Sequence, residues 1–317
     1  MKNLPKENVL KEILIETWQV ARELLKILIP VLVIVKVLKE FGGIEILGQL
    51  LSPLMSPMGL PGEIGIVWAA GILTNIYGAI ASLVSLQLAE PLTVAQSTVL
   101  GLMILLAHGL PVEIAICRQV GGVWKTFLAL RLIGALVFGL LLNLIFSVFG
   151  LFQEPATIVW APQKEESGIL DWLLNQASTL GFTVFVLFCL LVLMRVIKAI
   201  GLLDFLAKVL EPVLRLTGIS AKASGVAIIG LLAGITFGSG LLIAEAKKNE
   251  LSQRDIFLTL CLLSLCHGVI EDTGLVLLIG ANIWGVLVFR VVLSLIVIGI
   301  IARLTFFVPK KVSTATS

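Results

Sequence analysis

Long apolar runs are the feature that most limits how this 317-residue chain can fold. Several reach the roughly 20 residues that a helix needs to cross a hydrocarbon layer about 30 Å thick. Helices are the expected form because backbone groups in that layer find no water. The runs lack the period-two alternation of a membrane strand, so the sequence predicts an all-α polytopic membrane protein. The runs are Leu24–Leu38, Ile64–Leu88, Thr126–Phe152, Phe182–Met194, Ala223–Ala244 and Val286–Phe307.

The low charge content supports a membrane protein, and the small net charge excludes a nucleic-acid-binding protein. Charged residues make up 14% of the chain, against about a quarter in soluble domains. The net charge of +3 is small and spread along the sequence, so it leaves no footprint for nucleic acid. We therefore expect the lipid bilayer as a partner and no nucleic acid. The four cysteines lie in apolar or site-like stretches without C-x-x-C spacing, which is typical of reduced thiols that pack as small hydrophobes.

A second copy of one unit begins 159 residues after the first. Low-complexity apolar sequence does not readily produce matched Pro, His, Gly and Arg residues in a single register, so we interpret the match as a duplication. We expect a first repeat with an N-terminal interfacial helix at 1–152, an extramembrane linker at 153–167, a second repeat at 168–308 and a basic tail at 309–317. The identical pairs include Lys39–Lys198, Gly42–Gly201, Pro53–Pro212, Gly59–Gly218, His108–His267, Gly109–Gly268, Gly121–Gly280 and Arg131–Arg290.

Each repeat predicts the same order of elements. A spanning helix comes first and a shorter amphipathic helix with an internal Pro follows. A broken apolar segment, a short helix that opens with a capping box and stops at His-Gly, an acidic segment and a last spanning helix complete the unit. The predicted spanning helices are Leu24–Phe41 and Thr183–Ile200, the amphipathic helices Ile44–Met55 and Leu203–Leu214, and the capping boxes Thr93–Gln96 and Ser252–Asp255.

The two repeats also predict an orientation in the membrane. Basic residues near both chain ends place both termini in the cytoplasm by the positive-inside rule. The acidic linker favours an external midpoint and hence inverted copies, although Lys247, Lys248 and Arg254 then fall on the wrong side unless the preceding segment is re-entrant. We expect a multi-pass protein of the inner or plasma membrane, with two tandem and preferably inverted helical repeats that contain broken or re-entrant helices.

The chain has two histidines, His108 and His267, and they occupy equivalent positions before a Gly. Acids follow closely, at Glu113 in the first repeat and at Glu271 and Asp272 in the second. Ionisable groups at membrane depth are costly and usually face a cavity or a partner. We therefore expect two His–carboxylate sites that bind a cation, relay protons or hydrogen-bond a polar substrate. The alternative is a structural role, in which a charged imidazole complements the helix C-terminal dipole or a His–acid contact locks the helix break.

A metal site is left open at this point. Two imidazoles and three carboxylates would suit a borderline divalent ion. Only His267 and Glu271 stand four residues apart, and Gly268 is expected to break the helix between them. Any such site must therefore be assembled between separate elements.

The breaks in the apolar segments are the second candidate site. Unwound backbone there would expose N–H and C=O groups to a substrate, whereas the alternative is close helix packing through small residues. Arg131 and Arg290 would pair with Glu113 and Asp272, contact an anionic substrate, or extend to the membrane surface. The candidate substrate-binding residues of the two breaks are Thr74, Asn75, Tyr77, Thr236 and Ser239.

The sequence resembles a known family. The broken segments read GILTNIYG from Gly71 and GITFGSG from Gly234, and each is followed later by an HG turn and an acid. This pattern resembles the nucleoside-recognition (Gate) domain family, which includes the paired spore-maturation membrane proteins, and the chain looks like two such domains fused. The family's layout is similar to the gate regions of ferrous-iron permeases and nucleoside carriers, so the resemblance implies transport or gating.

Together these features predict a transporter-like protein that moves a small polar, nucleoside-like solute or an ion through a site between the repeats. The alternative is a non-transporting scaffold or assembly protein of the cell envelope. No P-loop, G-x-S-x-G or H-E-x-x-H motif stands in the sequence, so we expect no enzyme activity and no cofactor. A homo-oligomer is left open.

Overall fold

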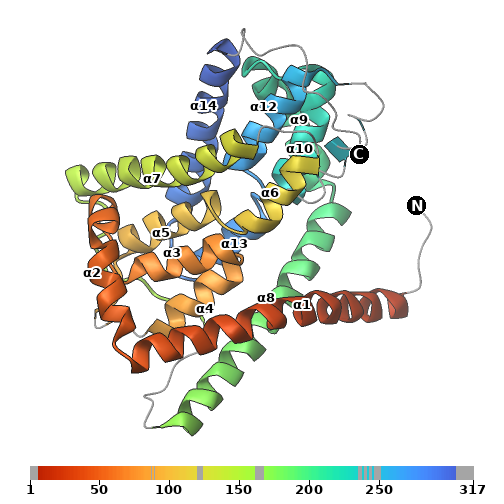
Figure 1. Ribbon diagram of the computed structural model, residues 1–317. Helices are drawn as coiled ribbons and strands as arrows, with labels where there is room; N and C mark the ends of the chain where they lie inside the picture. Colours follow the sequence, from red (N-terminus) through yellow and green to blue (C-terminus); the bar gives the residue numbers. More distant parts are fainter. Residues whose placement is uncertain are drawn as a thin grey trace, which may run out of the picture.

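The computed structural model describes residues 6–86, 88, 90–119, 124–160, 168–234, 238, 241, 242, 245 and 251–304. Within them the chain is helical, apart from one isolated bridge between Thr93 and Pro155 (Figure 1). The all-helical prediction is confirmed. The first half contains α1 (Lys6–Glu40), α2 (Gly43–Met55), η1 (Ser56–Met58), α3 (Ile64–Leu73), α4 (Ile76–Leu86), α5 (Val94–Leu106), α6 (Leu110–Gln119) and α7 (Trp124–Phe149). The second contains α8 (Ile169–Ala199), α9 (Leu202–Leu216), α10 (Ala221–Ala233), α12 (Gln253–Leu265), α13 (Glu271–Leu277), a π-helix η2 (Trp284–Phe289) and α14 (Arg290–Leu304).

The first helix of each repeat is longer than its apolar run. The interfacial helix feeds directly into the apolar run, as predicted, so that α1 is continuous over 35 residues. Helix α8 begins at Ile169 rather than at the predicted Thr183. The added turns carry polar residues that lower the hydropathy but are buried, and Gln176 accepts a hydrogen bond from Ser85 of α4. Figure 1 shows α1 crossing α8, and the two helices are in contact.

Glycines with left-handed backbone geometry stand at equivalent corners of the two repeats. Such φ angles are strained for other residues. The φ angle is 66° at Gly42 and 73° at Gly201, where α2 and α9 begin. The φ angles in the turns after the histidines agree more closely still, at 59° for Gly109 and 57° for Gly268. The duplication predicted from sequence is therefore also a duplication of backbone conformation.

The two predicted capping boxes differ in the structure. Thr93 and Gln96 form the reciprocal pair that opens α5. In the second repeat only one half is present, because Ser252 accepts from the backbone N–H of Asp255 while the Asp255 carboxylate accepts from the backbone N–H of Ser220. The prediction for Asp255 is therefore wrong. The Asp255 side chain is one methylene shorter than that of Glu or Gln. Its carboxylate accepts from the backbone N–H of Ser220 at the start of α10 instead.

The apolar run at 64–88 is broken where the sequence placed its polar residues. Helix α3 ends at Leu73, Thr74 caps it with irregular backbone, and α4 starts at Ile76. In the second repeat α10 ends at Gly234, whose φ is 95°. The predicted site residues Thr236 and Ser239 follow that glycine and lie outside the described residues.

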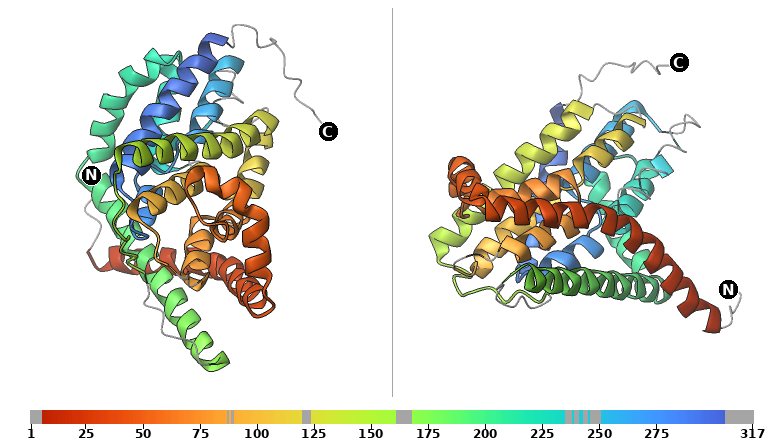
Figure 2. Two further views of the ribbon diagram at one scale, coloured as in Figure 1. Left: turned by 90° about the vertical axis from the view of Figure 1, so that its left-hand side faces the viewer. Right: turned by 60° about the horizontal axis from the view of Figure 1, so that its bottom comes forward.

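The repeats interlock through their central helices. Helix α5 packs against α7 of its own repeat and against η2 of the other, and α12 packs against both α14 and α7. Helix α5 is enclosed beyond its first turn: Leu100 and the run from Leu102 to Leu106 have 0% exposure. Figure 2 shows α7 lying across both halves. The core of the molecule is therefore shared between the repeats.

The linker between the repeats is also part of this interface. The backbone N–H of Val94 donates to Glu154, and that of Ala156 donates to Leu92, so the linker runs along the start of α5. Further on, the N–H of Val159 donates to Leu278 beyond α13. The first half of the linker thus holds the start of α5 and the end of α13 together.

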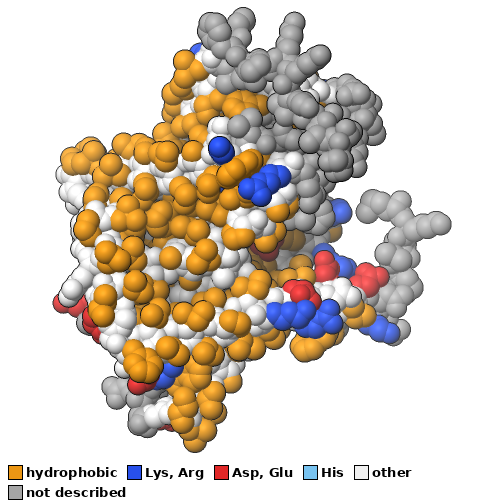
Figure 3. Space-filling model, viewed as in Figure 1, with side chains coloured by type: hydrophobic (Ala, Val, Ile, Leu, Met, Phe, Trp, Pro, Cys, Tyr) orange, Lys and Arg blue, Asp and Glu red, His pale blue; other side chains and the backbone are white. Residues whose placement is uncertain are grey.

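Among the described residues, four helical segments are long and apolar enough to cross a membrane: Val94–Arg118, Trp124–Phe149, Ile169–Ala199 and Trp284–Leu304. Helix α1 is not among them, because charged residues are distributed along it. The outer faces of α7 and α14 carry matched exposed apolar residues, with Ile133 and Val137 equivalent to Val292 and Ile296. Figure 3 shows apolar side chains over most of one face and charges gathered near the start of α1.

We expect Gly285→Ala to loosen the contact between η2 and α5. A Cβ at Gly285 would overlap the Cγ2 methyl of Thr98. That side chain cannot rotate away, because its hydroxyl donates to Val94 O at 2.6 Å and accepts from the backbone N–H of Asn282 at 2.7 Å. The expected cost is about 1–3 kcal/mol, measured as a lower melting temperature in detergent. Gly181→Ala is the matched control, since a Cβ there meets no described heavy atom within 4 Å. Equal melting temperatures for the two variants would contradict this account.

Candidate functional site

The two histidines meet in the centre of the molecule. Helices α5 and α12 both end two residues before their histidine. The imidazole rings of His108 and His267 lie 5.2 Å apart between ring centroids. Each Nδ1 faces the carbonyl of the residue four positions earlier, at 2.9 Å from Ile104 O and 2.6 Å from Leu263 O. Both side chains are buried. The equivalent motifs of the two repeats therefore form one site rather than two.

Glu113 lies between the two rings. It lies in the first turn of α6 and is 5% exposed. Its Oε1 is 3.6 Å from His108 Nε2 and also 3.6 Å from His267 Nε2. One carboxylate oxygen thus faces a nitrogen from each repeat. The sequence predicted that each histidine would associate with the acid of its own repeat, and only the His108 contact follows that pattern at this distance.

Two arginines from the last helices enclose the site. Arg131 and Arg290 are 0% and 1% exposed. Their guanidinium groups bind equivalent carbonyls, with Arg131 Nη2 at 2.8 Å from His108 O and Arg290 Nη2 at 3.2 Å from His267 O. Both therefore satisfy carbonyls that a broken helix leaves without partners. Arg131 and Arg290 occupy the matched positions that the duplication predicted.

The predicted ion pairs are confirmed on one side only. Arg131 forms an ion pair with Oε2 of Glu113. Arg290 makes no hydrogen bond to Asp272 and instead donates to Leu265 O and, across the repeat boundary, to Leu105 O, both at 3.1 Å. The predicted Arg290–Asp272 pair is therefore wrong. Carbonyls take the Nε and Nη2 groups of Arg290, whereas its Nη1 is buried without a described hydrogen-bond partner.

The acids of α13 retain unused hydrogen-bonding capacity. Asp272 Oδ2 lies 4.0 Å from His267 Nε2 and has no hydrogen-bond partner among the described residues. Tyr77 of α4 lies close enough to Glu271 and Asp272 to interact electrostatically, and its hydroxyl is likewise buried without a described partner. The break in the first repeat therefore faces the acidic helix of the second. These groups could hold a polar substrate or a cation.

Thr74 and Asn75 have structural partners within the break. The Thr74 hydroxyl donates to Ala70 O, and the Asn75 side chain accepts from the backbone N–H of Gly78. The break nevertheless borders the histidine turn, because the N–H of Gly109 donates to Gly71 O at 2.9 Å. The structure therefore brings the break and the His108 turn together, as a site between them requires.

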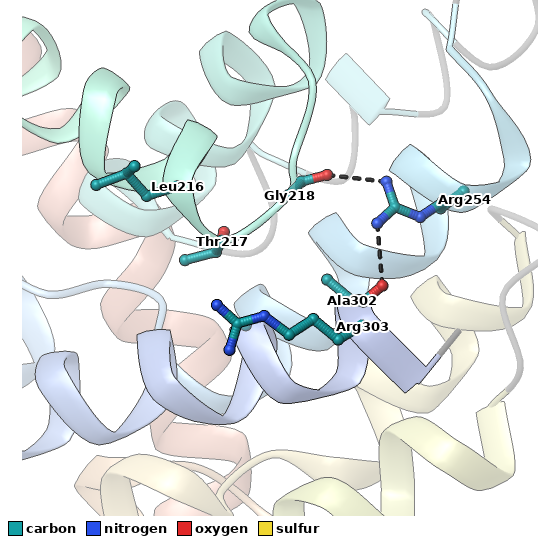
Figure 4. Close-up of a pocket in the computed structure, with 7 residues that line it drawn as sticks. Leu216, Thr217, Gly218, Arg254, Ala302 and Arg303 are labelled. Carbon is teal, nitrogen blue, oxygen red and sulfur yellow. Dashed lines mark hydrogen bonds between the residues drawn. The ribbon is translucent and has the colours of Figure 1, made fainter. Parts of the chain in front are cut away.

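A separate pocket lies away from this cluster. It has a volume of about 420 Å³ and includes no predicted site residue. Figure 4 shows Arg254 bridging two carbonyls in its wall, Gly218 O and Ala302 O, each at 3.0 Å. Arg254 thereby joins the start of α12 to the turn after α9 and to the end of α14. This arrangement is typical of a structural tie.

Sequence reasoning missed the residues that complete the site through their backbone. The carbonyls of Leu105 and Leu265 bind Arg290, but their side chains carry no signal of this role. Thr273, whose buried hydroxyl has no described partner, was also missed. Its place beside Asp272 at the start of α13 is the one signal that could have identified it.

Comparison with known proteins assigns the family. The family model for the Gate, or nucleoside recognition, domain matches residues 21–124 and 180–282. Each match falls within one repeat, and together they span more than half of the chain. The chain therefore belongs to the Gate family. A Bacillus subtilis (strain 168) protein described as the uncharacterized membrane protein YvoD is 27% identical over 291 residues, which is 90% of each chain. No solved structure matches.

The family match and the relative agree with the fold. This Gate protein has two copies of the domain and several apolar helices, and its relative is described as a membrane protein. It is a multi-pass membrane protein. His108, Glu113 and His267 lie inside the matched ranges, whereas both arginines lie just beyond the end of each match. The matched regions therefore supply the histidines and Glu113, and the flanking helices supply the two arginines.

We expect Arg131→Met to destabilise the protein by about 3–5 kcal/mol, because it leaves the buried Glu113 carboxylate and His108 O without a donor. The double variant Arg131→Met with Glu113→Met should recover part of this loss, since no buried charge is then left unpaired. Thermal unfolding in detergent measures both.

Arg195→Met is the matched control for this loss. The Arg195 guanidinium pairs with Glu12 and Glu16 of α1 in a partly exposed position, where the expected cost is below about 1 kcal/mol. Equal costs at positions 131 and 195 would show that the buried pair is not a special determinant of stability.

Proposed function

We propose that this Gate protein is a transporter-like membrane protein that moves a small polar solute, nucleoside-like in character, or an ion through the site between its repeats. The observation that carries the proposal is the buried cluster of His108, His267 and Glu113. Ionisable groups in the membrane interior are costly and mark substrate and ion pathways. The cluster is built from both repeats at helix breaks, which is where secondary transporters place their sites.

The unused hydrogen-bonding groups beside the cluster support the same function. Tyr77, Asp272 and Thr273 have buried polar atoms without described partners. Buried polar groups in proteins are almost always hydrogen-bonded, so this region is suited to a polar ligand. Close packing around the histidines corresponds to an occluded conformation, and alternating access would open the site as one repeat moves against the other. We place the protein in the inner or plasma membrane with both termini in the cytoplasm.

The rival function is a scaffold of the cell envelope, and a specific observation favours it. The Arg131–Glu113 pair is closed, and both arginines satisfy helix-end carbonyls. A cluster with only this task would hold the broken helices together and move nothing. The two functions differ in what happens when the histidines are removed from a folded protein.

Flux into proteoliposomes separates the two functions. Radiolabelled uridine and adenosine serve as solute probes, and proton and divalent-cation fluxes are followed with trapped indicators. We expect flux of at least one probe class above protein-free vesicles. It should fall to the protein-free level in His108→Gln and in His267→Gln, because each removes one nitrogen from the shared site.

Folding of each variant is checked by its elution and melting temperature before reconstitution. Gly181→Ala, which lies in α8 away from the cluster, is the control and should keep the wild-type flux. Unchanged flux in both single variants and in the double variant would overturn the proposal. A wild-type protein that moves none of the probes would favour the scaffold.

A further inference from the structure

The hydrogen bonds at Nδ1 decide which nitrogen of each imidazole is available. A carbonyl oxygen only accepts, so Nδ1 of His108 carries the proton that it donates to Ile104 O, and Nδ1 of His267 does the same toward Leu263 O. In a neutral imidazole the other nitrogen then keeps its lone pair. Both Nε2 atoms face Oε1 of Glu113. Three electron-pair donors therefore converge on one point.

The spacing of these atoms is wrong for hydrogen bonds and right for a shared ion. Each Nε2–Oε1 distance is 3.6 Å, longer than the ~3.2 Å limit of a good hydrogen bond. Two ligands of a tetrahedral ion at metal–ligand distances near 2.1 Å are about 3.4 Å apart. One nitrogen of each histidine and one oxygen of Glu113 all lie within 4.8 Å of one another. Two of the three spacings are therefore close to those of ligands around one ion, and the third is no longer than 4.8 Å.

The surroundings orient and balance such an ion. Metal-bound histidines usually donate their second nitrogen to a carbonyl or carboxylate, and ligating carboxylates are themselves hydrogen-bonded. Here Nδ1 of each ring has its carbonyl, and the other oxygen of Glu113 binds Arg131. The Asp272 carboxylate interacts electrostatically with Glu113, Glu271, Arg131 and Arg290. These three carboxylates and two guanidinium groups have a formal excess of one negative charge, which a cation offsets. Asp272 Oδ2 lies 4.0 Å from His267 Nε2 but outside the group of three ligand atoms.

We propose that His108 Nε2, His267 Nε2 and Glu113 Oε1 bind one divalent first-row transition-metal ion between the two repeats. Two imidazoles with one carboxylate suit Zn²⁺, Co²⁺ and their neighbours, whereas Mg²⁺ and Ca²⁺ prefer oxygen ligands alone. The inference rests on the proposed function where it names this ion class as the cargo or coupling ion of the transporter. Binding itself is independent of transport.

Metal analysis of the untagged full-length protein in detergent tests the site. A polyhistidine tag must be absent, because His108 and His267 are the only histidines of the chain. Metal content is measured by mass spectrometry after expression with added Zn²⁺, which allows loading during folding. Chelator-treated protein is then titrated with Co²⁺, whose visible absorption reports ligand number. We expect one equivalent of metal per chain by both routes, and no comparable binding of Mg²⁺ or Ca²⁺.

Variants identify the ligands. His108→Gln, His267→Gln and Glu113→Gln should each weaken Co²⁺ binding by about tenfold or more. Cys266→Ala is the matched control, because Cys266 is a buried thiol next to His267 and is not assigned as a ligand. Its affinity for Co²⁺ should equal that of the wild type. Where a variant does not fold, X-ray absorption of the Zn²⁺-loaded wild type gives the answer, with imidazole nitrogens near 2.0 Å and no sulfur near 2.3 Å.

The outcomes are distinct. Less than a tenth of an equivalent of metal in folded wild-type protein by both routes overturns the inference and leaves a cluster that shares protons. Sulfur scattering, or wild-type affinity in the three Gln variants, also overturns it. Stoichiometric metal without flux in proteoliposomes leaves the metal site standing and defeats the transport proposal. Solute flux that does not depend on metal, from protein that binds no metal, supports the transport proposal and overturns the metal site.

Discussion

The structure depends on how broken helices are tolerated in an apolar core. Helices α5 and α12 end in the centre of the molecule, where their last carbonyls cannot reach water. His108 and His267 turn back to bind a carbonyl one turn earlier, and Arg131 and Arg290 bind the carbonyl at the break itself. These four side chains supply hydrogen-bond donors to six carbonyls at the two helix breaks. The candidate site forms at the same place, because these contacts bring basic groups and their acidic partners together.

Duplication explains the symmetry of the site, and one methylene explains its asymmetry. Glu113 and Asp272 occupy equivalent positions at the start of short helices. The longer Glu113 side chain reaches both imidazoles and Arg131, whereas Asp272 stops 4.0 Å from His267. Arg290, without a carboxylate in reach, extends to the carbonyl of Leu105 in the other repeat. A pair of identical halves would have made two equal contacts. This chain makes one strong ion pair and one open carboxylate.

Much of the fold follows from the sequence, and the reasons for the failures are physical. The repeat register gave the order of helices, and the corner at Gly109 needs left-handed backbone that its sequence implied. The early start of α8 was missed because Gln176 is polar, yet its partner Ser85 lies 91 residues away. The residues of the cluster were predicted, but not that one Glu serves both histidines. The contact with His267 joins the two repeats, and periodicity within a single repeat does not contain that information.

The linker hydrogen bonds to the first turns of α5 and to the end of α13 have a consequence for the history of the chain. The covalent linker keeps the halves in a fixed one-to-one ratio, which two separate domains would have to reach by finding each other in the bilayer. Once fused, each half is released from the need to recognise a copy of itself. Substitutions such as Asp272 opposite Glu113 can then accumulate on one side only. Covalent linkage thus allows the equivalent positions of the two halves to take different roles.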